Sequence, residues 1–243
     1  MKTVILAGGR GTRLSEYTNL IPKPMVEIGE FPILWHIMKI YSAYGINEFI
    51  IALGYKGEVI KDYFLNYSYR TNNLLVNLGD GSIELNNAHS PNWTVHLIDT
   101  GLETQTGGRL KRLAEVIGNE PFMMTYGDGV ADVNISELLK FHLRHRKEAT
   151  LTAVNPPARY GDIELDDNGL VVSFREKVNS GLINGGFYVL NPSVLDCIDG
   201  DNIQFEKYPL EFLSETNQLM AYQHEGFWQC MDTVRDIEYH RRS

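Results

Sequence analysis

The sequence predicts an α/β fold, a doubly wound and mostly parallel sheet with antiparallel hairpin additions. Over the first 155 residues, apolar β-branched segments alternate with amphipathic helix-like segments, a rhythm typical of βαβ units. Two stretches, 74–87 and 163–175, break this alternation, because they place turn residues between alternating strands and therefore indicate antiparallel hairpins. In open sheets of this class, ligands bind at the carboxyl ends of the strands.

The elements follow in order along the chain. Residues 2–6 form an apolar run before three glycines and predict a strand. A helix is expected over 33–43, because Pro32 precedes its apolar side and Gly45 ends it. The same reasoning places strands at 49–53, 95–98, 122–126 and 150–154, and helices at 57–67, 108–117 and 138–146.

Length and composition indicate one ordinary soluble domain. A chain of 243 residues can bury roughly 70% of its unfolded surface. No repeat, low-complexity tract or linker interrupts it, so a single domain over 1–243 is expected. The net charge of −9 argues against a general nucleic-acid binder, which would normally have a basic face. An anionic substrate would therefore need a local cationic pocket.

Features of targeting and redox chemistry favour a reducing cytoplasm. Only five uncharged residues separate Lys2 from the glycines, which is too short for a signal-peptide core, and no run approaches a membrane span. The two cysteines, Cys197 and Cys230, lack the spacing of a zinc site, and we expect no structural disulfide. Cys230 is expected to be a buried structural thiol.

The segment 4–14 is the most informative part of the chain. Three glycines follow the first strand, so backbone N–H groups can approach a bound anion closely, and three cations accompany them. The glycines are Gly8, Gly9 and Gly11, and the cations are Arg10, Arg13 and Lys23. Such a loop after a strand suits a nucleotide polyphosphate. The alternative is a tight strand-to-helix turn with solvated arginines.

Spacing excludes two better-known phosphate loops. The dinucleotide fingerprint G-x-G-x-x-G would need a glycine where Leu14 stands, which argues against a nicotinamide oxidoreductase. The P-loop needs an adjacent glycine and lysine, and this segment supplies none.

Several motifs together resemble those of the sugar-1-phosphate nucleotidyltransferases. The first is Gly8-Gly9-x-Gly11-Thr12-Arg13-Leu14 followed by Lys23-Pro24-Met25. Others are similar to segments of glucose-1-phosphate cytidylyltransferases: Pro32-Ile33-Leu34-Trp35-His36-Ile37-Met38, Thr106-Gly107-Gly108-Arg109-Leu110-Lys111-Arg112, Tyr126-Gly127-Asp128-Gly129-Val130, Gly226-Phe227-Trp228 and Met231-Asp232-Thr233. The likeness runs in order from Met1 to about Tyr239.

The resemblance implies a Rossmann-like enzyme that transfers CMP from CTP to a phosphorylated acceptor with Mg²⁺. The expected acceptor is α-D-glucose 1-phosphate, which gives CDP-glucose and pyrophosphate. It also implies a nucleotide-binding half over about 1–130, an acceptor-binding half over about 131–243, and a homo-oligomer. Val178 replaces a proline that usually follows the glutamate-lysine pair of the family. Another phospho-acceptor, such as phosphoglutamine, therefore remains an alternative. A separate alternative is a non-catalytic nucleotide-binding subunit on the same fold.

Two aspartates are candidates for the metal. Asp128 follows strand 122–126 between Gly127 and Gly129, where a carboxylate is well placed to bind Mg²⁺ at a phosphate. By itself, the Asp-Gly pattern is also common in turns. The resemblance implies that Asp232 is the second ligand, although its position equally suits a helix N-cap.

The other site residues follow from the resemblance and from local chemistry. Lys23 lies between two prolines that restrict its backbone, which favours a fixed phosphate clamp. Lys177 is implied to contact the acceptor phosphate, or else is a surface lysine paired with Glu176. Thr104, Thr106 and Arg109 lie around the turn at Gly107-Gly108, where the resemblance places the nucleotide. The alternative is a helix N-terminus that Thr106 caps. The implied nucleotide site is Leu6, Ala7, Gly8, Gly9, Arg10, Gly11, Thr12, Arg13, Lys23, Thr104, Arg109 and Asp128, with Arg13 and Lys23 as catalytic cations.

Overall fold

The structure is a computed structural model. It describes residues 1–11, 18, 20–86, 90–156, 162–165, 171–175 and 181–231, and for 162–165 and 171–175 it describes the backbone alone. Among the described residues, no helix has the length and apolar character needed to cross a membrane.

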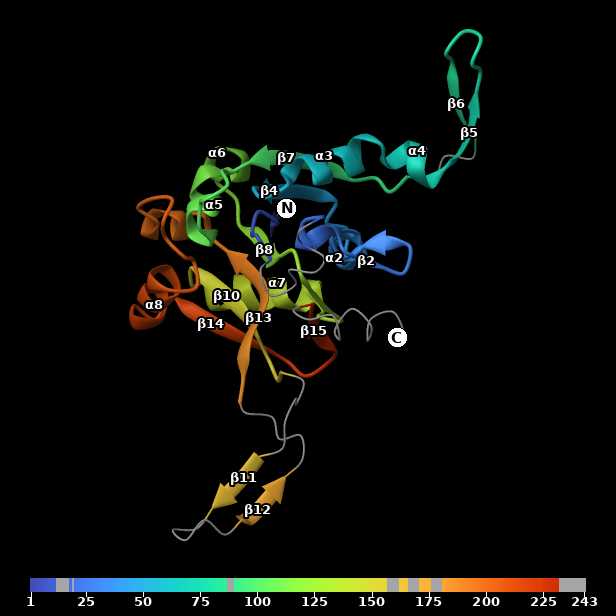
Figure 1. Ribbon diagram of the computed structural model, residues 1–243. Coiled ribbons are helices and arrows are strands. Elements are labelled where there is room, and N and C mark those ends of the chain that lie inside the picture. Colours follow the sequence, from blue (N-terminus) through green and yellow to red (C-terminus); the bar gives the residue numbers. More distant parts are fainter. Residues whose placement is uncertain are drawn as a thin grey trace.

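A seven-stranded, mostly parallel sheet forms the centre of the molecule (Figure 1). In spatial order its strands are β14 (Leu219–His224), β10 (Ala149–Val154), β13 (Ile183–Leu190), β8 (Phe122–Tyr126), β1 (Lys2–Leu6), β4 (Glu48–Leu53) and β7 (Thr94–Asp99). Pairing is parallel throughout, except that β13 runs antiparallel to both of its neighbours. The predicted α/β sheet is confirmed, whereas the sequence did not reveal β13.

Helices cover both faces of the sheet because the central strands are apolar on both sides. Along β1, Val4 and Leu6 enter one core cluster, whereas Ile5 enters the other. One face carries α2 (Ile33–Ser42), α3 (Gly57–Leu65) and α7 (Ile135–His145). The opposite face carries α5 (Thr106–Arg112), α6 (Ala114–Ile117), η3 (Pro192–Cys197) and α8 (Tyr208–Glu215). The doubly wound arrangement follows from this alternation.

Short elements modify the predicted pattern. The helix expected over 57–67 continues past Asn66 as α4 (Tyr67–Thr71), and the one expected over 108–117 divides at Leu113 into α5 and α6. Both predicted hairpins are confirmed, and two more strand pairs occur. The pairs are β5 (Asn73–Val76) with β6 (Ile83–Asn86), β11 (Asp162–Leu165) with β12 (Val171–Arg175), β2 (Glu27–Ile28) with β3 (Phe31–Pro32), and β9 (Gly129–Ala131) with β15 (Trp228–Cys230).

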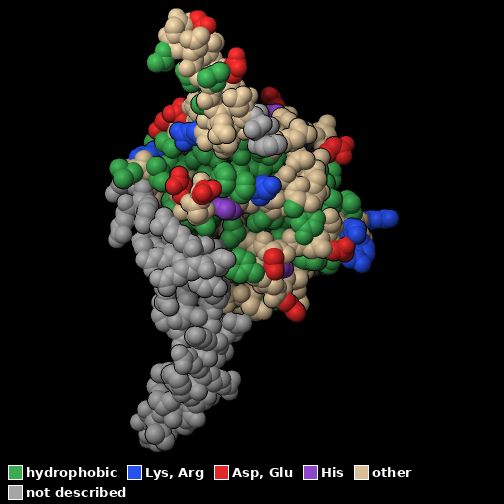
Figure 2. Space-filling model, turned by 90° about the vertical axis from the view of Figure 1, so that its right-hand side faces the viewer, with side chains coloured by type: hydrophobic (Ala, Val, Ile, Leu, Met, Phe, Trp, Pro, Cys, Tyr) green, Lys and Arg blue, Asp and Glu red, His purple; other side chains and the backbone are tan. Residues whose placement is uncertain are grey.

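The β5–β6 hairpin projects from the body and carries exposed apolar side chains (Figures 1 and 2). Leu75 is 57% exposed on β5, and Leu78 near the tip is 93% exposed. Leu74, Val76, Ile83 and Leu85 are exposed as well. An isolated two-stranded hairpin is marginally stable in water, so a hairpin with this composition suits contact with another surface.

Burial of a histidine makes stability depend on pH. His142 on α7 is 2% exposed, and its ring contacts Thr150 and Asn191. Burial lowers the pKa of His142 below its ordinary value of 6.5, and burial lowers that of neighbouring His145 as well. Below pH 6.5 the unfolded chain therefore binds more protons than the folded chain, and the free energy of unfolding falls as the pH drops toward the folded pKa.

A His142→Gln variant tests this dependence. We expect a smaller loss of unfolding free energy between pH 7.5 and pH 5.5 than in the parent protein, as measured by urea denaturation. Equal losses in the two proteins would assign the acid sensitivity to other groups.

Candidate functional site

A cavity of about 350 Å³ opens at the carboxyl ends of β1 and β8, beside the loop that follows β7. It is lined by Leu6, Ala7, Gly8, Gly9, Gly11, Lys23, Pro24, Thr104, Gln105, Thr106, Arg109, Tyr126, Gly127 and Asp128. The carboxyl ends of adjacent parallel strands meet at this edge, where open α/β sheets bind ligands.

The glycine loop after β1 is held by bonds that continue the sheet. Gly127 donates its N–H to the Leu6 carbonyl at 3.1 Å, and Tyr55 donates its N–H to the Gly8 carbonyl at 3.0 Å. Gly11 has φ +61°, the left-handed region that favours glycine. The loop is therefore fixed at both neighbouring strands, with the glycine backbone facing the cavity.

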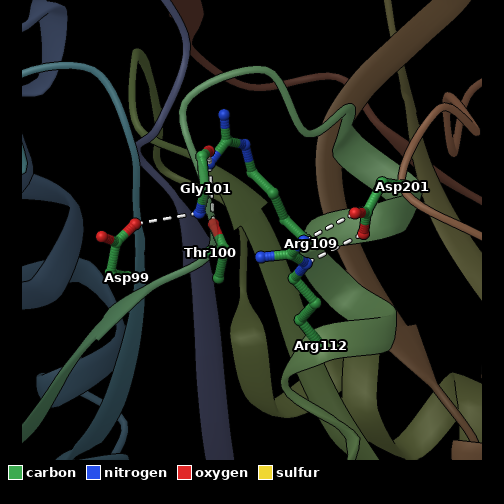
Figure 3. A network of polar contacts seen from close by, with 6 residues as sticks. All are labelled: Asp99, Thr100, Gly101, Arg109, Arg112 and Asp201. Carbon is green, nitrogen blue, oxygen red and sulfur yellow. Dashed lines mark hydrogen bonds and ion pairs between the residues drawn. The ribbon is translucent and has the colours of Figure 1, made fainter.

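Arg109 supports this loop through a hydrogen bond to the Gly8 carbonyl. Figure 3 shows its guanidinium beside Thr100 and Gly101, which follow β7. Although it is only 4% exposed, its guanidinium donates to the carbonyl oxygens of Gly8, Leu53, Gly101 and Leu102 and to the Thr100 hydroxyl, at 2.7–3.3 Å. Burial lowers the pKa of Arg109. A Cβ at Gly8 would collide with this guanidinium, which explains the glycine. These hydrogen bonds connect the loop after β1, the end of β4 and the loop after β7, while the Arg109 side chain also lines the cavity.

The helix behind the cavity is held close to the 201–205 loop. Arg112 forms a two-pronged ion pair with Asp201 at 2.8 and 2.6 Å (Figure 3). A Cβ at Gly107 would lie 2.8 Å from the Ile203 carbonyl oxygen, so this glycine permits close packing. Thr106 does not form the cap of the alternative interpretation: its hydroxyl donates to Glu206 at 2.6 Å and accepts the Phe205 N–H.

Lys23 and Asp128 meet in the cavity, although they are 105 positions apart. The Lys23 Nζ lies 2.6 Å from the Asp128 Oδ2, and the two side chains are 11% and 26% exposed. Pro22 is extended, and Pro24 packs against Gly127, where a Cβ would be 2.8 Å from the proline ring. The two restrained segments thus hold an ammonium beside a carboxylate.

A second cavity of about 490 Å³ adjoins the first through two residues common to both, Tyr126 and Asp128. Its other described residues are Thr125, Gly129, Asn184, Gly185, Gly186, Glu206, Trp228 and Cys230. Because β13 runs antiparallel, its first residues lie at the same edge as the carboxyl ends of β8 and β10. Two neighbouring cavities joined at a carboxylate suit two substrates that react with each other.

The structure brings most of the predicted nucleotide site together. Leu6, Ala7, Gly8, Gly9, Gly11, Lys23, Thr104, Arg109 and Asp128 all line the first cavity. Arg10 is not among its lining residues, because its side chain pairs with Glu103 on the surface. Thr12, Arg13, Lys177 and Asp232 lie outside the described residues, so their roles remain predictions.

Several lining residues had not been singled out as site residues. Glu206 has no local signal that marks it, since its partners Thr106 and Tyr126 are distant in the sequence. Asn184 was not assigned a role either, although its partner Tyr188 is only four positions away. Trp228, which had been named only as part of a family motif, lines the second cavity. Cys230, expected to be a buried structural thiol, is partly exposed and lines the same cavity.

Of the two aspartates predicted to bind the metal, the structure describes Asp128. Within the described part of the chain, no three His, Cys, Asp or Glu side chains gather as a metal cluster. The Met231 N–H donates to the Asp128 carbonyl at 2.8 Å, so β15 leads the chain directly past Asp128. Asp232 follows Met231 in the sequence and lies outside the described residues.

Comparison with known proteins identifies the family. A family model described as nucleotidyl transferase matches residues 2–237. The chain belongs to this family. A glucose-1-phosphate cytidylyltransferase of Salmonella typhi is 53% identical to this nucleotidyl transferase over 242 residues, covering 98% of this chain and 94% of that protein. A probable glucose-1-phosphate cytidylyltransferase of Bacillus subtilis (strain 168) is 45% identical, covering 98% and 93%.

Solved structures agree with this family. The crystal structure of HddC from Yersinia pseudotuberculosis complexed with GMP-PN matches with a TM-score of 0.71 at 26% identity, covering 99% of this chain and 98% of that one. The relatives support a sugar-phosphate nucleotidyltransferase, and this nucleotidyl transferase is an enzyme. Its family generally uses a divalent metal ion.

Proposed function

We propose that this nucleotidyl transferase transfers CMP from CTP to α-D-glucose 1-phosphate, giving CDP-glucose and pyrophosphate. The observation that carries the proposal is the Lys23–Asp128 pair, at the junction of a glycine-lined cavity and a second cavity. The choice of CTP and glucose 1-phosphate is supported by relatives of those names at 53% and 45% identity.

The first cavity suits the nucleotide. Gly8, Gly9 and Gly11 present backbone without side chains, which lets N–H groups approach phosphate oxygens. Lys23 supplies a buried cation at the junction, where charge develops during the transfer. We infer that the base lies toward Thr104, which lines the same cavity. Arg13 would add a second cation to the triphosphate, as its place in the motif implies.

The reaction needs positioning more than acid–base chemistry. A phosphate oxygen of the acceptor forms a bond to the α-phosphorus of CTP, and the bond from that phosphorus to the bridging oxygen breaks. The electron pair leaves with pyrophosphate. The acceptor phosphate has a second pKa of about 6 and is already largely dianionic at neutral pH, so no general base is required. Catalysis then depends on alignment and charge neutralisation.

Asp128 has the chemistry required of a magnesium ligand. Its carboxylate already holds a cation, the Lys23 ammonium, and faces the junction of the cavities. Magnesium usually takes only one or two protein carboxylates, with phosphates and water as the other ligands. Asp128 and Asp232 would hold the ion, which would neutralise phosphate charge when bound. Lys177 would hold the acceptor phosphate.

A pyrophosphate assay tests the proposal. The protein is incubated with Mg²⁺, each of the four common nucleoside triphosphates, and a panel of phospho-acceptors that includes glucose 1-phosphate and phosphoglutamine. We expect release only with CTP and glucose 1-phosphate. Release with another pair would correct the substrates, and silence across the panel would favour a non-catalytic nucleotide-binding subunit.

We also propose that the enzyme is a homo-oligomer joined through the β5–β6 hairpin, whose exposed apolar side chains support such a contact. We expect light scattering to give a multiple of the 27.6 kDa chain mass. Replacing Leu75 and Ile83 by glutamate should then reduce the mass of the particle. An unchanged mass in this variant would place the interface elsewhere.

A further inference from the structure

The second cavity is acidic among its described residues. Asp128 and Glu206 contribute carboxylates, and no lysine or arginine is present among the described lining residues. Asp128 lies at the junction with the first cavity, whereas Glu206 lines only the second. A phosphorylated acceptor would therefore place its phosphate at the Lys23–Asp128 end and the rest of the molecule toward Glu206.

The Glu206 carboxylate is held rigidly by two hydrogen bonds. The Tyr126 hydroxyl donates to Oε1 at 2.6 Å, and the Thr106 hydroxyl donates to Oε2 at 2.6 Å. Both donors come from other elements, the end of β8 and the start of α5. Because each carboxylate oxygen is fixed by a different element, little side-chain freedom remains to be lost on binding a ligand.

A chain of hydrogen bonds leads from Asn184 through Tyr188 and Tyr126 to Glu206. Asn184 donates its amide N–H to the Tyr188 hydroxyl, which lies 3.1 Å from the Tyr126 hydroxyl. Burial raises the pKa of Tyr126 well above its ordinary value, so this phenol stays a donor at neutral pH. With its single proton on Glu206, Tyr126 accepts from Tyr188. The chain of hydrogen bonds thus ends at the Glu206 carboxylate.

Glu206 has acceptor capacity left for a ligand. An ionised carboxylate accepts at about four lone-pair sites, and the hydrogen bonds from Thr106 and Tyr126 occupy two of them. Asn184, by contrast, also accepts the Gly186 N–H, so both ends of its amide are engaged. The Trp228 indole donates to the Gly185 carbonyl at 2.7 Å, which fixes this ring as an apolar wall. Convergent polar groups beside apolar walls are typical of small-molecule sites.

We propose that Glu206 is the specificity-determining residue for the acceptor: its carboxylate accepts hydrogen bonds from the hydroxyl groups of a neutral sugar and disfavours acceptors with a second anionic group. This inference rests on the proposed function, because it assigns the acceptor to the second cavity. It adds the chemical class that the cavity selects, an uncharged polyhydroxylated group attached to the phosphate.

The test compares glucose 1-phosphate with glucuronic acid 1-phosphate, which differ by one carboxylate. Like charges brought together in a site disfavour binding strongly, so we expect the parent protein to prefer glucose 1-phosphate by about 10²-fold in kcat/KM. In Glu206→Gln the preference should fall at least about tenfold, through improved use of the uronic acid. Glu215→Gln on α8 is the matched control, which removes the same charge from an exposed site and should keep the preference.

Two further measurements separate the possible failures. Thermal unfolding shows whether Glu206→Gln is folded, and ligand-observed NMR with Mg²⁺ and a non-hydrolysable CTP analogue reports binding of each sugar phosphate without turnover. Turnover of both sugars at equal efficiency overturns the inference and leaves the proposed function intact. Selective binding of glucose 1-phosphate without pyrophosphate release supports the inference and overturns the proposed function. Failure to bind either sugar overturns both.

Discussion

Replacing Lys23 by methionine is expected to lower the rate of pyrophosphate release by about 10²–10³-fold, the loss typical of one preorganised charge contact. Lys23 carries a cation at the junction of two cavities, 2.6 Å from Asp128 and largely shielded from water. In such surroundings a charge acts more strongly than it does in solution. Methionine keeps much of the length of the side chain and removes only the ammonium.

Steady-state kinetics and circular dichroism together check this expectation. The control is Lys61→Met, which removes an exposed lysine of α3 and should leave the rate unchanged. A folded Lys23→Met protein with nearly normal turnover would show that the ammonium is not part of the catalytic machinery.

A second substitution, Arg109→Met, is expected to reduce the free energy of unfolding by about 3–5 kcal/mol, since it leaves several buried oxygen acceptors without a donor. The guanidinium of Arg109 donates to five oxygens, which belong to the loop after β1, the end of β4 and the loop after β7. Four of these acceptors are carbonyl oxygens and one is a hydroxyl, so none is a carboxylate. Its loss should release the Gly8 backbone, so the KM for the nucleotide should rise as well.

Arg112→Met provides the contrast on the same helix. Arg112 forms the shorter, two-pronged ion pair with Asp201, but both side chains are exposed, and exposed ion pairs contribute little to stability. Urea denaturation of the two variants should therefore show a large loss for Arg109 and a small one for Arg112. Similar losses would mean that the loop network is not what Arg109 stabilises.

Much of the fold could be predicted because burial determines the pattern of the central strands. The apolar run at 2–6 and the alternation of its side chains between two core clusters required helices on both faces. The direction of β13 could not be predicted in this way, since a buried strand has the same composition whether it runs parallel or antiparallel. Its register with β8 and β10 depends on tertiary contacts.

The site could be predicted only where local chemistry marks it. The glycines after β1 and the prolines around Lys23 restrict the backbone in ways that sequence displays. The meeting of Lys23 with Asp128 depends on Pro24 packing at Gly127, a contact between distant segments. Glu206 has no local signal at all, because its partners Thr106 and Tyr126 are 100 and 80 positions away.

The antiparallel direction of β13 also determines where the chain leaves the sheet and returns to it. Val154, at the end of β10, pairs with Ile183, at the start of β13, so the chain leaves and rejoins the sheet at one place, next to Asn184 of the second cavity. The 28 positions between them form an excursion whose length the strand order does not constrain. We expect insertions or deletions there to leave the backbone of Gly8, Gly9 and Gly11 unchanged, because these glycines follow a different strand, β1. Under the proposed function, the antiparallel direction of β13 would allow the acceptor to change between related enzymes while the nucleotide stays the same.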